Sequence, residues 1–130
     1  MSRHLGFSKV KRLKKSKDIE TLFQTGKAFR VYPLKCVLST HQQTAEQTER
    51  IKVAVGIAKK NCKRAHNRNY VKRLLRECVR LQWHSLEQLA GGQQLHMFVS
   101  FVGDWQLVNL EMVEQAYQQL LLQIHNHLKT

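Results

Sequence analysis

Apolar side chains recur every three to four residues in three segments of the chain, a period that predicts amphipathic helices. These segments are residues 16–25, about 64–83 and 110–128. Gly26 directly follows the first segment, where it supplies a stop signal for the helix. The third segment carries almost no basic residue, so we expect its apolar stripe to pack on the core of the fold.

Strand-like patterns fill much of the remaining chain. Residues 28–40 mix aromatic and β-branched side chains around a proline, which predicts an edge strand followed by a second strand. Residues 51–57 place their larger apolar side chains at odd positions, and Gly56 on the other face leaves room for a close approach. Residues 95–102 predict a buried strand. The order helix, strands, helix, strand, helix predicts an α+β or mixed α/β sandwich, with helices packed on one sheet.

The size and composition fit one folded domain. The chain has 130 residues, of which 42% are hydrophobic, and no linker divides it, so we expect a single domain over residues 1–130 with a flexible basic segment at 1–15. The longest nearly unbroken apolar stretch, residues 95–103, is about half of what a bilayer requires, so we expect no membrane contact. Cys36, Cys62 and Cys78 lack metal-ligand spacing, and indicate reduced thiols in a cytoplasmic protein without a metal site.

The charge of the chain is large and unevenly distributed. The net charge is +13, from 22 Lys and Arg against 9 Asp and Glu. Residues 1–80 hold 21 of the basic residues and 5 of the acids, whereas residues 81–130 hold one and four. Such an excess creates a strong positive field, and indicates a polyanionic partner for the first two thirds of the chain.

The second predicted helix concentrates this charge on one face. At about 100° per residue, Val71, Leu74, Leu75, Cys78 and Leu81 share one arc of the helix. Arg68, Asn69, Lys72, Arg73, Arg76 and Arg80 share another arc, and Lys59, Lys60, Lys63 and Arg64 lead into it. Like charges repel on a helix surface, so a face of this kind indicates an anion that neutralises it. We therefore predict that these ten residues bind nucleic acid.

At this helix the sequence resembles the protein subunit of bacterial ribonuclease P. The pattern KK-x5-H-x-RN-x2-KR-x2-RE over residues 59–77 is similar to the family's Arg-Asn-Arg signature and the basic residues after it. The opening of the chain is also similar, at Phe7, Arg12-Leu13, Ser16, Ile19, Phe23 and Gly26-Lys27. The strand VAVGIAKK, the strand near residues 95–102 and the closing helix follow in the family's order.

The resemblance implies a fold and a function. The implied fold is an α-β-β-β-α-β-α sandwich, similar to the second domain of ribosomal protein S5, with one mixed four-stranded sheet and a left-handed βαβ crossover, an exception to the usual handedness. The implied partners are the catalytic RNA subunit, which with Mg²⁺ removes the 5′ leader of precursor tRNA, and precursor tRNA itself. Residues implied to line the cleft for the leader are Ile19, Phe23, Leu34 and Val37.

Three positions depart from the family pattern. Tyr70 replaces the last arginine of the signature, Ile19 stands where phenylalanine is frequent, and Val102-Gly103-Asp104 replaces a stretch that is often basic. Tyr70 lies at the edge of the apolar arc, so it contacts RNA or packs in the core.

The sequence offers no catalytic group of its own. It contains no paired carboxylates, no Ser/His/Asp constellation and no glycine-rich phosphate loop, and His66 alone is a weak basis for nuclease chemistry. We expect no cofactor held by the protein alone, with Mg²⁺ accompanying the RNA subunit. The alternative function is a structural RNA-binding protein, similar to a ribosomal protein, with no role in cleavage.

Overall fold

A computed structural model describes residues 12–13, 16–41 and 51–129 of the chain. The helices are α1 (Ser16–Thr25), α2 (Ala65–Leu81), α3 (Trp83–Ala90) and α4 (Leu110–Lys129), with short 3-10 helices η3 (Lys59–Asn61) and η4 (Trp105–Leu107). The strands are β1 (Lys27–Val31), β2 (Leu34–His41), β3 (Ile51–Ile57) and β4 (Gln94–Phe101). The predicted flexibility of residues 1–15 concerns residues that lie outside this description, apart from Arg12 and Leu13.

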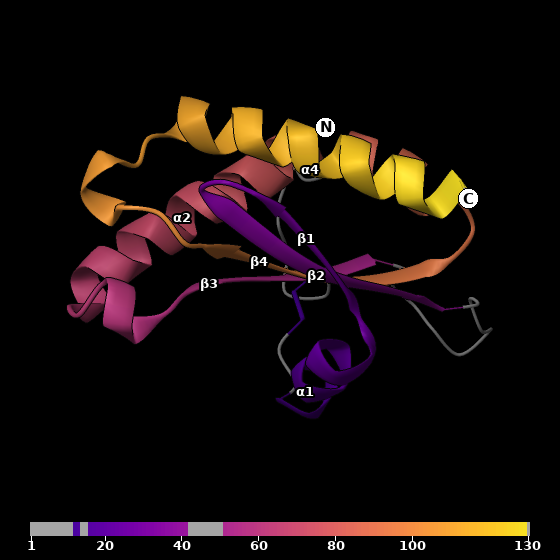
Figure 1. Ribbon diagram of the computed structural model, residues 1–130, viewed down its shortest axis with the longest axis horizontal. Coiled ribbons are helices and arrows are strands. Elements are labelled where there is room, and N and C mark those ends of the chain that lie inside the picture. Colours follow the sequence, from indigo (N-terminus) through magenta and orange to yellow (C-terminus); the bar gives the residue numbers. More distant parts are fainter. Residues whose placement is uncertain (1–11, 14–15, 42–50, 130) are drawn as a thin grey trace.

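The strands form one mixed sheet in the order β1-β2-β4-β3. β1 pairs with β2 and β2 with β4 in antiparallel fashion, whereas β3 and β4 are parallel. Parallel neighbours need a long crossover, which α2 and α3 provide here. In Figure 1, α2 and α4 lie on one side of the sheet and α1 lies on the other. The predicted α+β sandwich with a four-stranded sheet is therefore confirmed.

The main core lies between the sheet and the pair α2 and α4. The side chains of β4 alternate between buried and partly exposed, as expected for a strand with one core face. The largest side chains sealed in the core include Tyr117, Phe101, Leu75 and Leu120. The closing helix is structural, as predicted, because six of its residues are buried.

A smaller apolar cluster joins α1 to the other face of the sheet. Its buried members are Leu13, Leu22 and Val37, and Ile19, Ala54 and Phe98 pack against them. Gly26 permits the close approach of α1 to the sheet, since a Cβ there would lie 2.7 Å from Cγ1 of Val37. Gly56 likewise leaves room for the ring of Phe98, as the sequence predicted, because a Cβ would lie 2.9 Å from that ring.

The helix predicted over about residues 64–83 corresponds to α2, which ends two residues earlier, and the structure adds α3, which the sequence pattern did not indicate. Gln82 leaves the helical region, with φ −113° and ψ 25°, so the chain turns before Trp83. Leu81, the residue before this turn, is 48% exposed, although it was predicted to lie in the buried arc, whereas Val79 is buried. No helix in the described residues is long and apolar enough to span a bilayer.

Candidate nucleic-acid interface

The position of α2 in the fold separates its two faces. Val71, Leu75 and Cys78 are buried against the sheet and α4, so the arc that carries the basic side chains is directed away from the core. Burial raises the pKa of Cys78 to about 12, as expected for a thiol enclosed by apolar side chains. Apart from Leu81, which is exposed, the two arcs predicted from the sequence are thus the core-facing and the outer faces of α2.

Arg68 braces the connection that leads into α2. Its Nη1 atom donates to the carbonyl oxygen of Cys62 at 2.9 Å and to that of Lys63 at 2.7 Å. Cys62 is itself buried. Arg68 therefore fixes the segment that holds Lys63 and Arg64, in addition to contributing a positive charge to the surface.

Two other arginines of the predicted set have neighbours that the sequence did not indicate. Arg80 forms an ion pair with Glu77, one turn away on the same helix, and this carboxylate neutralises part of its charge. Partial burial and the nearby charge of Arg12 lower the pKa of Arg76. Arg12 pairs with Val53 beside the edge strand β3. The cationic face of α2 therefore extends to Arg12.

Tyr70 lies on the surface rather than in the core. Its side chain is 39% exposed, and the guanidinium carbon of Arg73 lies 5.8 Å from the centroid of its ring. Both residues line a small hollow of about 190 Å³, together with His66, Asn67 and Asn69. The departure from the family signature at this position thus replaces a cation with an aromatic ring that an RNA base can contact.

The predicted basic residues follow one another along η3, the connection after it and α2. Lys59 and Lys60 lie on η3, Lys63 and Arg64 lie in the connection, and these four side chains are exposed. Asn69 and Arg73 are exposed on α2, whereas Arg68, Lys72, Arg76 and Arg80 are partly buried there. Arg12 belongs to the same surface but was missed, because only the tertiary contact places it beside Arg76.

The cleft residues predicted from the resemblance divide between the two faces of the sheet. Val37 and Ile19 lie in the cluster beneath α1, and Phe23 is 53% exposed, with its ring centroid 5.2 Å from that of Phe98. Leu34 is wrong as a cleft residue, because it is fully buried in the main core. Side chains alternate along a strand, so Leu34 and Val37, three residues apart, point to opposite faces.

Two cations lie on the same face of the sheet as this aromatic pair. Arg30 on β1 is directly opposite Lys35 on β2, and both are exposed. Lys35 is two residues from Val37, so it points to the same face. Like charges opposite each other destabilise a sheet, and an anion that binds between them removes this cost. The register of the sheet, which the sequence does not reveal, creates this pair.

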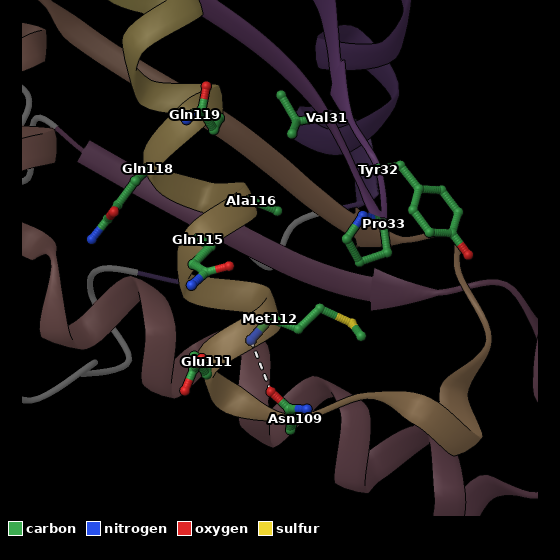
Figure 2. Close-up of a pocket in the computed structure, with 10 residues that line it drawn as sticks. All are labelled: Val31, Tyr32, Pro33, Asn109, Glu111, Met112, Gln115, Ala116, Gln118 and Gln119. Carbon is green, nitrogen blue, oxygen red and sulfur yellow. Dashed lines mark hydrogen bonds between the residues drawn. The ribbon is translucent and has the colours of Figure 1, made fainter.

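A wider hollow of about 600 Å³ lies on the other side of the molecule, between the β1–β2 hairpin and α4. Figure 2 shows Tyr32 and Pro33 on one wall and the amide side chains of Gln115 and Gln119 on the other. It is lined by Glu111 and by no Lys or Arg among the described residues. A site without cations is a poor match for a polyanion, so α2 and the α1 face of the sheet remain the candidate interface.

Clusters of metal-ligating side chains were sought among the described residues. No group of three or more His, Cys, Asp or Glu side chains in the described ranges lies close enough together to hold a metal ion. The Mg²⁺ implied by the resemblance, and its place with the RNA subunit, stay predictions.

Comparisons with known proteins identify the relatives of this chain. A model of the ribonuclease P family matches residues 7–125. The ribonuclease P protein component of Porphyromonas gingivalis is 39% identical over 123 residues, which cover 92% of this chain and 86% of that protein. The protein component of Proteus mirabilis is 57% identical over a shorter stretch of 35 residues, which covers 27% of this chain and 29% of that protein.

Solved structures show the same fold. The RNase P protein from Thermotoga maritima superimposes with a TM-score of 0.67 at 18% identity, covering 85% of this chain and 94% of that one. The Staphylococcus aureus RNase P protein gives a TM-score of 0.66 at 15% identity, covering 85% and 92%. Since the family model and the P. gingivalis relative both span nearly the whole chain, this protein belongs to the ribonuclease P protein component family.

Proposed function

We propose that this chain binds the catalytic RNA of ribonuclease P through α2 and the 5′ leader of precursor tRNA through the α1 face of its sheet. As a member of its family, the chain is the protein part of a ribonucleoprotein endoribonuclease that acts in tRNA 5′ maturation. The single observation that carries the proposal is the concentration of basic side chains on the outer face of α2 and on the connection before it.

The α2 surface is suited to a folded RNA. Its arginines present planar forks that match phosphate oxygens, and its lysines contribute point charges along the backbone. Asn69 is exposed among them and can both donate and accept hydrogen bonds. Binding releases counterions from the RNA, so the affinity falls steeply as salt is added.

The α1 face of the sheet is suited to an unpaired strand. Single-stranded RNA is typically held by stacking on aromatic rings beside a positively charged groove. The exposed ring of Phe23, its neighbour Phe98 and the cations Arg30 and Lys35 supply both features. Ile19 contributes apolar contact without an aromatic face, so we assign most of the stacking to Phe23.

The chemistry of phosphodiester cleavage is assigned to the RNA subunit with its Mg²⁺. The protein contributes positive charge that screens the phosphates of RNA subunit and substrate, which lowers the Mg²⁺ concentration that the complex requires. The cytoplasm is the proposed compartment, since Cys36, Cys62 and Cys78 are free thiols.

The decisive experiment is reconstitution of the holoenzyme with its RNA subunit. We expect the chain to restore precursor tRNA cleavage at low Mg²⁺, and to show no cleavage without the RNA subunit. Arg73→Ala weakens RNA-subunit binding and reduces the slope of log K against log salt by about one unit per lost phosphate contact. Lys129→Ala, which removes an exposed cation at the end of α4, is the matched control and leaves both quantities unchanged.

Two results would reject the proposal. Cleavage by the protein alone would place the catalytic groups in this chain. RNA binding without any stimulation of cleavage would identify it as a structural RNA-binding protein instead.

A further inference from the structure

A hollow of about 310 Å³ lies where η3, the start of α2 and η4 meet. The residues that line it include Lys60, Asn61, Lys63, Arg64, Asn67 and Trp105. Trp105 comes from the connection between β4 and α4, so the fold brings it from a distant part of the sequence to the basic segment. The volume of the hollow is at the lower end of the range for ligand pockets.

The lining of the hollow is basic and polar, with one aromatic ring. Three cations and two carboxamides surround one indole ring, and no Asp or Glu lines the hollow. The N-terminus of α2 opens here, and Arg64 at its N-cap makes no side-chain capping hydrogen bond. A ligand for this hollow is therefore anionic, and it has a planar group that can contact the indole.

Both walls of the hollow are held in place by hydrogen bonds that do not involve a ligand. On one wall, Arg68 fixes the carbonyl groups of Cys62 and Lys63. On the other, the carboxylate of Asp104 accepts a hydrogen bond from the backbone N–H of Gln106 at 3.0 Å, which fixes the turn that carries Trp105. A preorganised site loses little conformational entropy when it binds its ligand.

We propose that this hollow binds one unpaired nucleotide of RNA, with its base stacked on Trp105 and its phosphate held by Lys63 and Arg64. The proposal rests on the RNA-binding function proposed above and adds an aromatic contact to it. Asn67 can donate to and accept from the edge of the base. A base in a regular RNA helix has both faces covered by its neighbours, so the hollow selects a bulged, looped or leader nucleotide.

The test uses Trp105→Ala and Trp105→Phe, with Leu107→Ala as the matched control, because Leu107 is 66% exposed on the same 3-10 helix and does not line the hollow. We expect Trp105→Ala to weaken RNA binding by about tenfold, in keeping with the loss of one stacked base. The slope of log K against log salt stays unchanged, since no cation is removed. Trp105→Phe retains most of the affinity, and Leu107→Ala retains all of it.

Three RNAs identify the source of the nucleotide. A loss of affinity for the isolated RNA subunit assigns the nucleotide to that RNA, whereas a loss confined to the holoenzyme with precursor tRNA, and absent with mature tRNA, assigns it to the leader. No loss for any of the three overturns the inference. If Arg73→Ala weakens RNA-subunit binding and Trp105→Ala weakens binding of none of the three RNAs, this inference fails while the proposed function stands. If Arg73→Ala does not weaken RNA-subunit binding, the proposed function fails too.

Intrinsic fluorescence provides a readout that does not depend on the folding of an alanine variant. Trp83, the other tryptophan, is only 6% exposed, so titration with a short unstructured oligoribonucleotide should quench mainly Trp105. The quenching should be absent in Trp105→Phe. Equal quenching of the wild type and of Trp105→Phe would overturn the stacking contact.

Discussion

Replacement of Arg68 with alanine separates the two roles that the structure gives this residue. On the helix, Arg68 belongs to the arc predicted to contact RNA. In the structure, its Nη1 atom also donates to the carbonyl oxygens of Cys62 and Lys63. Arg68→Ala therefore removes a charge from the surface and two hydrogen bonds from the connection that precedes α2.

The expected loss of stability follows from these two bonds. Hydrogen bonds that involve a charged group contribute about 1.5–3 kcal/mol each when they are well protected from water. The bond to Cys62 is partly buried, whereas the bond to Lys63 is exposed, where water replaces it at little cost. We expect Arg68→Ala to lower the free energy of unfolding by about 2 kcal/mol, which corresponds to a fall of about 8 °C in Tm for a domain of this size.

Thermal unfolding and RNA binding at several salt concentrations measure the two roles separately. Arg68→Lys keeps the charge but lacks the planar fork. It should therefore lose most of the stabilisation that Arg68 provides, and retain most of the salt dependence of RNA binding. Arg73→Ala should change Tm by less than about 2 °C, because its side chain is exposed. An Arg68→Ala variant that melts within about 1 °C of the wild type would refute the bracing role.

Three further predictions concern the rest of the fold. Phe23→Ala should weaken binding of precursor tRNA by about 1–3 kcal/mol and leave mature tRNA binding unchanged. The control Leu122→Ala, at a residue of similar exposure on α4, should change neither affinity. Equal losses of affinity for both tRNAs would argue against leader contact. Tyr117→Phe should raise the free energy of unfolding by about 1 kcal/mol in chemical denaturation, because the buried hydroxyl of Tyr117 has no hydrogen-bond partner within the described residues. A clear decrease in the free energy of unfolding would show that this hydroxyl has a partner. Burial lowers the pKa of His96, so the folded state binds fewer protons there than the unfolded state. The free energy of unfolding therefore falls as the pH drops below about 6.5. In His96→Gln, the decrease in the free energy of unfolding between pH 7 and pH 5 should be smaller.

The sequence by itself determined the types and order of most elements and the chemistry of α2. Hydrophobic periodicity is a local property, so α1, α4 and the strands followed from it with only small differences at their ends. The charged and apolar arcs of α2 followed for the same reason, since angles around one helix need no knowledge of its neighbours. Local signals also fixed the role of Gly56, where a missing side chain indicates a close approach.

The tertiary structure decided which face each strand residue occupies and which distant residues meet. The sheet register placed Leu34 in the main core and set Arg30 opposite Lys35, and neither result follows from the order of residues along one strand. The packing of the chain beside β3 brought Arg12 close to Arg76. The connection after β4 placed Trp105 beside the basic segment before α2. Such contacts depend on how elements pair in space, which a one-dimensional pattern does not encode.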